Sequence, residues 1–386
     1  MTKDPRKRRA ADLLPGSPRP DVASDDSMSF AARLLTWWDA HGRKDLPWQH
    51  DRTAYRVWVS EIMLQQTQVA TVIGYFQRFV ARFPDVASLA AAAQDEVLHH
   101  WAGLGYYARG RNLHRAAQTI CTQFNGELPP TPAELATLPG IGRSTANAID
   151  ALARDGRSPI LDGNVKRVLA RWRGIAGWPG NSDVEAQLWQ ISADVLPTGR
   201  LADYTQAIMD LGATLCTRSK PNCTSCPLTA DCIAALTEQT STLPTPRPRR
   251  DLPEREVCMW VVLCEGAILL QRRPPSGIWG GLWGFPESPA APAEAIQGQQ
   301  ATLLDQLGLS RATLEPPTRL PTFTHVFTHF RLRIEPLLVL LPGAIDEQQL
   351  KVAEPDQYMW YRAGEQRVGL SAVVTRVLAE LRQTPS

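Results

Sequence analysis

The sequence predicts a multidomain protein, an all-α domain followed by a smaller α+β domain, and three observations support this. Its 386 residues are enough for two hydrophobic cores. Apolar residues recur at spacings of three and four from Phe30 to about Ala235, whereas alternating patterns appear only after residue 257. Residues 238–256 are rich in proline and arginine. They separate the region of helical spacing from the region of alternating patterns and are expected to form an extended linker.

The composition is that of an ordinary globular protein, with 44% hydrophobic and 21% charged residues. No run approaches the roughly 18 apolar residues of a membrane span, and no apolar segment follows the basic first residues. We therefore expect a location in the cytoplasm or nucleoid of a bacterium, or in the nucleus of a eukaryote. Because the net charge is only +2, any contact with nucleic acid must rest on local groups. Residues 1–27 are poor in large apolar side chains and are expected to be a disordered leader.

The first domain, residues 28–237, is expected to be helical throughout. A helical spacing of apolar residues runs from Val57 to Leu64 and on through Val69 to Phe79. The other helices are expected at about 94–101, 111–122, 131–137, 144–153, 164–172, 183–195 and 203–212.

The second domain, residues 257–386, mixes the two periodicities. A hairpin is expected at 257–272, turning at Glu265-Gly266, and a half-buried strand at 330–335. Helices are expected at 293–307 and from about Ser371 onward.

Four of the seven cysteines lie within seventeen residues, at Cys216, Cys223, Cys226 and Cys232. Without a secretory signal, such a set favours metal binding over disulfides. Zinc and a [4Fe–4S] cluster both accept four thiolates, and spacing alone leaves both open.

Two features suit a DNA phosphate. Residues 138–144 place Gly140 and Gly142 in a turn between two helices, and the second helix presents free backbone N–H groups at its start. Arg218 and Lys220 add positive charge on the tight first loop of the cysteine cluster. An ordinary helix connection and a solvated edge are the alternatives.

Two acids stand out as a pair for cleaving a glycosidic bond. Glu61 lies among apolar residues of a helix, where burial would raise its pKa and keep it a proton donor. Asp162 stands where an apolar segment gives way to a helix, and backbone N–H donors there are expected to keep it ionised. A solvent-edge Glu and a purely structural N-cap are the alternatives. Glycosidic cleavage needs one protonated and one charged carboxyl.

Taken together, these motifs resemble the MutY family of adenine DNA glycosylases, within the helix-hairpin-helix superfamily that includes endonuclease III. The stretches that carry the resemblance are 42–49, 60–72, 103–109, 138–146, 159–171, 209–227 and 274–286. The resemblance implies a six-helix module at about 53–159 and an iron–sulfur module formed by 28–52 with 160–237.

The resemblance also implies roles for individual residues. Glu61 would protonate the adenine ring, Asp162 would stabilise or trap the oxocarbenium ion, and Asn164 would support Asp162. The four cysteines would ligate a [4Fe–4S] cluster. Because the base must be flipped out of the duplex, wedge residues are expected.

Further residues would contact the DNA or line the base pocket. Those expected at the DNA are Gln65, Gln66, Tyr106, Gly140, Gly142, Ser144, Arg218 and Lys220, and those expected around the adenine are Arg43, Leu46, Trp48 and Gln206.

Ser144 occupies the position of the lysine nucleophile in the lyase-competent relatives. Without that amine no Schiff base forms there, so the resemblance implies a monofunctional glycosylase. Lys166 lies near Asp162 in sequence but is not assigned to catalysis.

The second domain resembles the Nudix-like domain that recognises 8-oxoguanine in this family. The loop Phe327-Thr328-His329 matches the family's reading loop, with Thr in place of Ser. A Nudix hydrolase would carry an acidic metal-binding helix, but 293–307 holds only Glu294 and Asp305 as acids, so pyrophosphate hydrolysis is not expected.

The implied function is removal of adenine opposite 8-oxoguanine or guanine in duplex DNA, by a monomer. Three alternatives are an oxidised-pyrimidine glycosylase with lyase activity, a non-catalytic DNA-binding protein and a Nudix nucleotide hydrolase. Ser144 disfavours the lyase, and the pair of acids disfavours a non-catalytic protein. The missing acidic helix disfavours a Nudix hydrolase.

Overall fold

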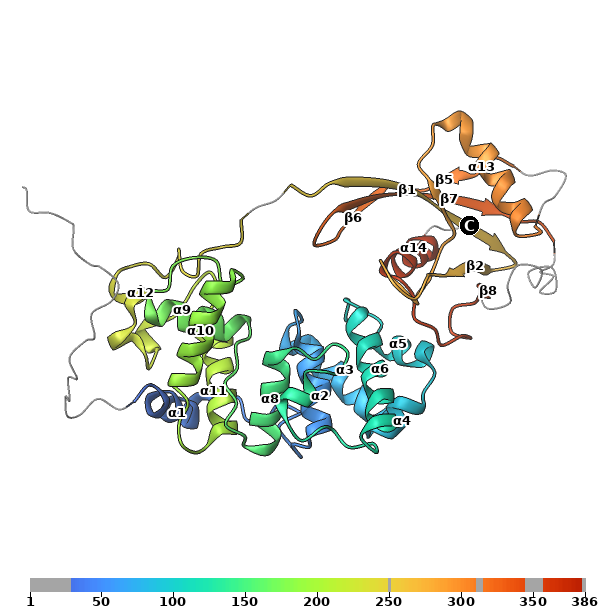
Figure 1. The fold of residues 1–386 in the computed structure, drawn as a ribbon. Helices are drawn as coiled ribbons and strands as arrows, with labels where there is room; N and C mark the ends of the chain where they lie inside the picture. Colours follow the sequence, from blue (N-terminus) through green and yellow to red (C-terminus); the bar gives the residue numbers. More distant parts are fainter. Residues whose placement is uncertain (1–28, 249–250, 310–314, 344–356, 384–386) are drawn as a thin grey trace, which may run out of the picture.

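The computed structural model describes residues 29–248, 251–309, 315–343 and 357–383, and the expected leader at 1–27 lies outside them. An all-helical domain is followed by a domain built on one sheet, as Figure 1 shows. This order confirms the predicted fold class.

The first domain contains twelve α-helices and two short 3₁₀ turns within the described residues. They are α1 (Phe30–His41), α2 (Ala54–Leu64), α3 (Val69–Arg82), α4 (Val86–Ala91), α5 (Gln94–Trp101), α6 (Ala108–Gln123), α7 (Pro132–Leu135), α8 (Arg143–Arg154), α9 (Gly163–Arg173), α10 (Ser182–Asp194), α11 (Leu201–Thr214), η1 (Cys223–Ser225), η2 (Thr229–Asp231) and α12 (Ile233–Leu236).

The helical spacing from Val57 to Phe79 belongs to two helices, α2 and α3, because the chain turns at 65–68. Gln66 adopts a left-handed backbone conformation with φ of 59°, which turns the chain between α2 and α3. The apolar spacing survives the break because both helices bury residues in the same core. Periodicity alone therefore did not show the turn.

Arg109 of α6 takes the place of a C-cap for α2. Its Nη1 donates to the carbonyl oxygens of Ile62, Met63 and Gln65 at 2.9, 2.8 and 2.5 Å, and its Nη2 donates to that of Leu104 at 3.2 Å. Burial lowers the pKa of the guanidinium to about 10. The turn that carries Gln65 and Gln66 is therefore fixed by a buried cation.

One hydrophobic core holds the helical domain together. Its largest fully buried side chains are Trp58, Trp101, Phe76, Phe79 and Phe83. Helix α11 packs against α1, α8 and α9, and so reaches both halves of the domain. None of the described helices combines the length and apolar character that a membrane crossing requires.

The second domain is a mixed sheet covered by a helix on each face. Its strands and helices are β1 (Glu254–Cys264), β2 (Ala267–Arg272), β3 (Trp283–Gly284), β4 (Glu287–Pro289), α13 (Ala293–Gln306), β5 (Thr318–Arg319), β6 (Phe323–Val326), β7 (Arg331–Leu340), β8 (Tyr358–Tyr361) and α14 (Ala372–Gln383). The sheet runs β3-β2-β1-β7-β5, with β4 on β1, β6 on β7 and β8 on β2. Strands β1 and β7 are parallel, and the other strand pairs are antiparallel.

Strand β1 begins at Glu254, three residues before the expected start of the domain. Residues Glu254–Glu256 pair with Arg331–Arg333 of β7. They are exposed and charged, so hydropathy did not reveal them. Farther along β1, Trp260 belongs to the cluster under α13 and Val261 to the cluster under α14. This period of two explains why the strand is apolar on both faces.

The two domains are also in direct contact. Asp95 of α5 forms an ion pair with Arg272 of β2. Leu282, which precedes β3, is fully buried and belongs to the core of the helical domain. The chain therefore joins the domains twice, once covalently through the linker and once through this packed interface.

We expect loss of Arg109 to destabilise the helical domain. An Arg109→Ala substitution leaves several buried carbonyl groups without a donor, so the free energy of unfolding should fall by at least about 3 kcal/mol. Urea unfolding followed by circular dichroism measures this. Replacing the exposed Arg78 by Ala should change it by less than about 1 kcal/mol, and equal effects of the two substitutions would contradict the capping role.

Candidate active site and cysteine loop

The two acids predicted as a pair are placed by two helices. Glu61 lies on α2, and Asp162 is the N-cap of α9. The negative charge of Asp162 raises the pKa of Glu61, which shows that the two groups lie close enough to interact electrostatically. The structure therefore brings together two residues that are one hundred and one positions apart in the sequence.

Burial is the larger cause of the shift at Glu61 and, with the charge of Asp162, raises its pKa to about 8. Burial also raises the pKa of Asp162 above its ordinary value, which differs from the expectation that its N-cap position keeps it fully ionised. Hydrogen bonds from backbone N–H groups and the charge of Arg167 oppose that rise at Asp162. Asp162 therefore loses its proton first, and Glu61 keeps one near neutral pH.

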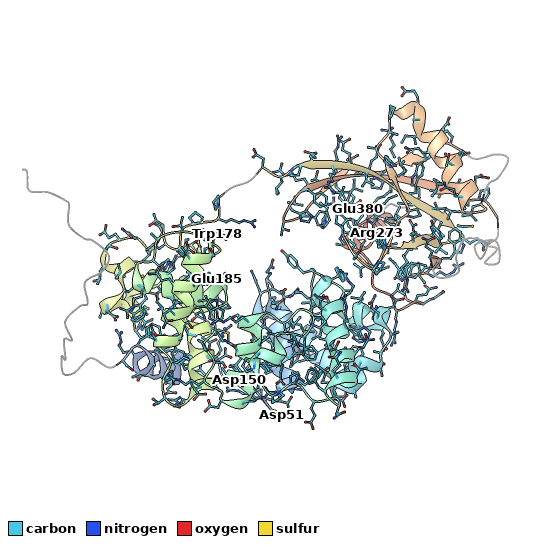
Figure 2. All side chains as sticks on the ribbon, in the orientation of Figure 1. Asp51, Asp150, Trp178, Glu185, Arg273 and Glu380 are labelled. Atoms are coloured by element: carbon cyan, nitrogen blue, oxygen red, sulfur yellow. The ribbon has the colours of Figure 1, made fainter. Side chains whose placement is uncertain are left out.

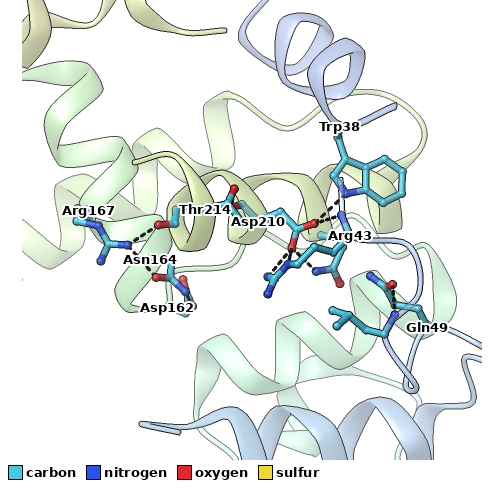
Figure 3. Close-up of polar contacts among 11 residues, drawn as sticks. Trp38, Arg43, Gln49, Asp162, Asn164, Arg167, Asp210 and Thr214 are labelled. Carbon is cyan, nitrogen blue, oxygen red and sulfur yellow. Dashed lines mark hydrogen bonds and ion pairs between the residues drawn. The ribbon is translucent and has the colours of Figure 1, made fainter. Parts of the chain in front are cut away.

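Asp162 is held from two sides. Its Oδ1 accepts from the Val165 N–H at 2.7 Å, and its Oδ2 accepts from Asn164 Nδ2 at 3.3 Å. Asn164 Oδ1 in turn accepts from Arg167 Nη2 at 2.9 Å. Figure 3 shows this group of side chains at the start of α9. Asn164 thus orients the carboxylate and is itself oriented by a cation.

Arg167 also reaches the first cysteine of the cluster loop. Its Nε donates to the Cys216 carbonyl oxygen at 2.7 Å, and its Nη2 donates to that of Gly212 at 2.7 Å. A Cβ at Gly212 would lie 2.7 Å from Asn164 Cβ, so α11 packs directly against the start of α9. The candidate active site and the cysteine loop therefore share one arginine.

The four cysteines line one cavity next to Arg171. Burial, together with the charges of the other three cysteines, raises the pKa of the Cys226 thiol to about 11. Arg171 Nη1 lies 3.4 Å from Cys216 Sγ, where it can donate to a thiolate. Across the described residues, no three or more His, Cys, Asp or Glu side chains converge as ligands of a single metal ion.

Two of the four residues expected around the adenine, Arg43 and Gln206, bind a buried acid that the sequence did not indicate. Asp210 of α11 is fully buried and accepts from Arg43 Nη2 at 2.6 Å, from Gln206 Nε2 at 2.9 Å and from Trp38 Nε1 at 3.2 Å. Figure 3 draws this cluster beside the Asp162 group. The carboxylate fixes the direction in which Arg43 and Gln206 point.

Leu46 and Trp48, the other expected pocket residues, are buried in the same domain core. The Trp48 ring lies 5.5 Å from that of Phe76, edge to face. Their part in a base pocket stays a prediction.

The expected DNA-probing residues lie on two adjacent turns. Gln65 ends α2 and donates from Nε2 to Thr145 Oγ1 at 3.3 Å, while Gln66 beside it is exposed. Tyr106 precedes α6, has φ of 47° and exposes half of its side chain (50%). Arg109 lies over the Tyr106 ring at 5.6 Å, so the cation that caps α2 also supports this tyrosine.

The hairpin between α7 and α8 has the predicted form. Thr131 and Glu134 form the expected capping box, and Gly140 has φ of 80°. A Cβ at Gly140 would lie 2.8 Å from Asn112 Cβ, so only glycine fits this turn. Gly142 is the N-cap of α8 and satisfies none of the first N–H groups with a side chain. Those groups can receive an anion.

Ser144 has a structural hydrogen bond. Its Oγ accepts from the Leu161 N–H at 3.1 Å, which ties α8 to the segment just before Asp162. Lys166 forms an ion pair with Glu185 at 2.7 Å. In Figure 2, Glu185 and Trp178 lie toward the upper edge of the helical domain, and Asp51 and Asp150 lie toward its lower edge. Arg218 and Lys220 are exposed on the cysteine loop.

The expected reading loop of the second domain is a turn between β6 and β7. The Phe327 N–H donates to the Phe330 carbonyl oxygen at 2.9 Å, and the two rings stack at 4.6 Å. Thr328 and His329 are exposed at its tip, with Thr328 Oγ1 3.3 Å from His329 Nδ1. The hydroxyl and the imidazole are thus presented to solvent on an aromatic base.

Comparison with known proteins identifies both domains. Residues 59–193 match the HhH-GPD superfamily of base excision DNA repair proteins, and residues 257–380 match the NUDIX domain. An adenine DNA glycosylase of Buchnera aphidicola from Acyrthosiphon pisum is 36% identical over 355 residues, covering 92% of this chain and 98% of that protein. The adenine DNA glycosylase of Mus musculus is also 36% identical, covering 90% and 78%.

The chain belongs to the adenine DNA glycosylase family. Among solved structures, a thermostable thymine-DNA glycosylase has a TM-score of 0.50 and 25% identity, covering 54% of this chain and 95% of that one. That likeness extends over about as much of the chain as the helical domain does.

Three positioning residues of this adenine DNA glycosylase family member escaped sequence analysis: Arg167, Asp210 and Arg109. A weak signal existed for two of them. Arg167 follows Asn164 by three positions and Asp210 follows Gln206 by four, which are the spacings that place helical side chains on one face. Arg109 acts on a distant turn, and no local spacing indicates that contact.

We expect Glu61→Gln to remove a loss of folding stability that the wild-type protein suffers as the pH rises. Because the folded pKa of about 8 lies above the ordinary value of 4.5, the folded protein keeps a proton that the unfolded chain releases. Wild-type stability therefore falls from about pH 4.5 to pH 8 relative to the variant. Melting temperatures across this range measure the difference, with the exposed Glu127→Gln as a control; a constant difference would contradict the raised pKa.

Proposed function

We propose that this member of the adenine DNA glycosylase family hydrolyses the N-glycosidic bond of adenine opposite 8-oxoguanine, and also opposite guanine, in duplex DNA. The observation that carries the proposal is the pair Glu61 and Asp162, in which one buried carboxyl has a pKa of about 8 beside a second that ionises before it. Family membership supports adenine as the base.

In the proposed reaction Glu61 donates its proton to a ring nitrogen of the flipped adenine. The carbon–nitrogen bond breaks, and its electron pair leaves with the base. Asp162, held by Asn164, stabilises the positive charge that develops on the sugar. Water then attacks the sugar carbon, and the Glu61 carboxylate takes up the water proton. Arg43 and Gln206, aligned by Asp210, would bind the adenine.

The proposed DNA contacts do not read sequence. The N-terminus of α8 behind Gly140 and Gly142 would hold a phosphate, and Arg218 and Lys220 would hold others. Gln65, Gln66 and Tyr106 would enter the duplex beside the extruded adenosine. Ser144 offers a hydroxyl already used by the Leu161 N–H, which supports hydrolysis without lyase chemistry. We propose that the protein acts as a monomer on DNA, in the nucleoid or nucleus.

The cysteine loop is proposed to hold a [4Fe–4S] cluster through Cys216, Cys223, Cys226 and Cys232. The four cysteines line one cavity beside Arg171, and four thiolates are the ligand set that such a cluster takes. Membership of the adenine DNA glycosylase family supports the cluster over a zinc ion. When bound, the cluster would fix the loop that carries Arg218 and Lys220.

In the second domain, Thr328 and His329 are proposed to read 8-oxoguanine in the opposite strand. Both are exposed at the tip of the β6–β7 turn, and Phe327 behind them is held by stacking on Phe330. The Thr328 hydroxyl supplies the donor that the family's serine supplies, with one more methyl group. Helix α13 packs its apolar face on the sheet and carries only Glu294 and Asp305 as acids.

Single-turnover excision tests the proposed substrate. Duplexes would carry adenine opposite 8-oxoguanine, adenine opposite guanine, or an oxidised pyrimidine, each developed with and without alkali. We expect alkali-dependent cleavage of both adenine duplexes, faster opposite 8-oxoguanine, and none of the pyrimidine duplex. Glu61→Gln should abolish excision and retain binding. Cleavage without alkali, or no reaction on either adenine duplex, would overturn the proposal.

Metal analysis tests the proposed cluster. We expect about four irons per chain, together with visible absorbance. Cys226→Ser should lose both, whereas Cys121→Ser, which alters a cysteine of α6 outside the loop, should keep both. One zinc per chain in the wild-type protein would contradict the cluster.

A further inference from the structure

The interface between the domains contains a tight loop at 279–282, which we name the docking loop. Leu282 at its end is fully buried in the core of the helical domain, although it belongs to the second domain in sequence. Gly281 has φ of 72°, and a Cβ there would lie 2.9 Å from Gln94 Nε2 of α5. The docking loop therefore lies directly against α5, and its left-handed backbone at Gly281 favours glycine.

Arg111 of α6 is the polar anchor of the docking loop. Its Nη1 donates to the Gly280 carbonyl oxygen at 2.5 Å. Burial lowers the pKa of the guanidinium, so the cation lies partly out of water. A charged donor on a partly buried carbonyl makes a strong and directional contact. This contact joins one helix of the first domain to one backbone position of the second.

The other end of the docking loop contacts the proposed reading loop. The Trp279 ring lies 5.2 Å from the Phe327 ring and 5.3 Å from the His325 ring. Trp279 itself has φ of 52°, a conformation that a bulky residue adopts only where its surroundings hold it. Phe327 is therefore in contact with Trp279, whose neighbour Gly280 accepts the hydrogen bond from Arg111.

Arg111 also lies in the first turn of α6, which directly follows the proposed wedge residue Tyr106. The Arg111 N–H donates to the Tyr107 carbonyl oxygen at 3.0 Å in the first turn of α6, directly after Tyr106. The Tyr107 hydroxyl donates to the Leu370 carbonyl oxygen of the second domain at 3.2 Å. The chain directly after Tyr106 is thus attached to the second domain at two positions, Tyr107 and Arg111.

From this arrangement we infer that Arg111 is a positioning residue that couples the base opposite the adenine to the wedge. The path runs from Phe327 through Trp279 and the Gly280 carbonyl to Arg111, and from there along the first turn of α6 to Tyr106. Occupation of the reading loop then sets the position of Tyr106 in the duplex. The inference rests on the proposed function, because it concerns discrimination between 8-oxoguanine and guanine.

Arg111→Met tests the coupling, since it keeps the aliphatic part of the side chain and removes the donor. The measured quantity is the ratio of single-turnover excision rates opposite 8-oxoguanine and opposite guanine. We expect this ratio to fall on the order of tenfold, with most of the loss opposite 8-oxoguanine. Arg111→Lys, which restores a cationic donor, should recover part of the ratio. A merely structural loss would slow both substrates equally.

Two controls make the result specific. Arg115→Met removes an exposed cation one turn farther along α6 and should leave the ratio unchanged. Trp279→Leu breaks the path on the other side of the docking loop and should lower the ratio as Arg111→Met does. If both act on one path, the double variant should lose little more than either single variant. Additive losses would overturn the coupling.

A second measurement follows insertion of the wedge into the duplex when no base is excised. In the Glu61→Gln background, 2-aminopurine beside the target adenine reports unstacking by its fluorescence. We expect a larger increase opposite 8-oxoguanine than opposite guanine, and Arg111→Met should remove that difference. Equal rates on both duplexes with the wild-type enzyme would remove the proposed reading function itself. Discrimination in the wild type that Arg111→Met retains would overturn the coupling alone.

Discussion

The burial of the Glu61 carboxyl beside Asp162 is the constraint on which the rest of the helical domain depends. Taking a carboxyl group out of water next to another acid is unfavourable unless it stays protonated, and the pKa of about 8 expresses that cost. The cost is tolerated because α2 is fixed around Glu61 by a large core and by Arg109 at its end. The same burial that opposes folding prepares the proton that the proposed reaction uses.

Arginines that are buried or half-buried connect helices and loops through hydrogen bonds, which the hydrophobic core alone does not provide. Arg109 joins α6 to the end of α2, Arg167 joins α9 to the cysteine loop, and Arg111 joins α6 to the second domain. Each donates to backbone carbonyls or to an amide, where the planar fork fixes direction as well as distance. These joints connect the proposed chemistry, the proposed cluster and the proposed reading loop into one framework, and a lysine would not reproduce their geometry.

The second domain keeps the architecture of a Nudix fold while its proposed function lies elsewhere. Helix α13 packs Ile296 and Leu304 on the sheet and offers only Glu294 and Asp305 as acids. The exposed chemistry is at the opposite end of β7, where Thr328 and His329 stand on a stack of aromatic rings. A fold can therefore be retained as a support for one loop. The long parallel pairing of β1 with β7 connects that loop to the centre of the sheet.

The sequence by itself determined the fold class, the order of the elements and the residues that carry the proposed chemistry, because each of these leaves a local mark. Helical spacing, the glycines of the hairpin and the cysteine cluster are patterns within short windows, and Asp162 was recognisable as an N-cap. Only the tertiary structure decided the break after Leu64, the pKa of Asp162, the role of Asp210 and the docking of 279–282 on α5 and α6. These depend on burial and on contacts between distant segments, and neither quantity is a property of a short stretch of sequence.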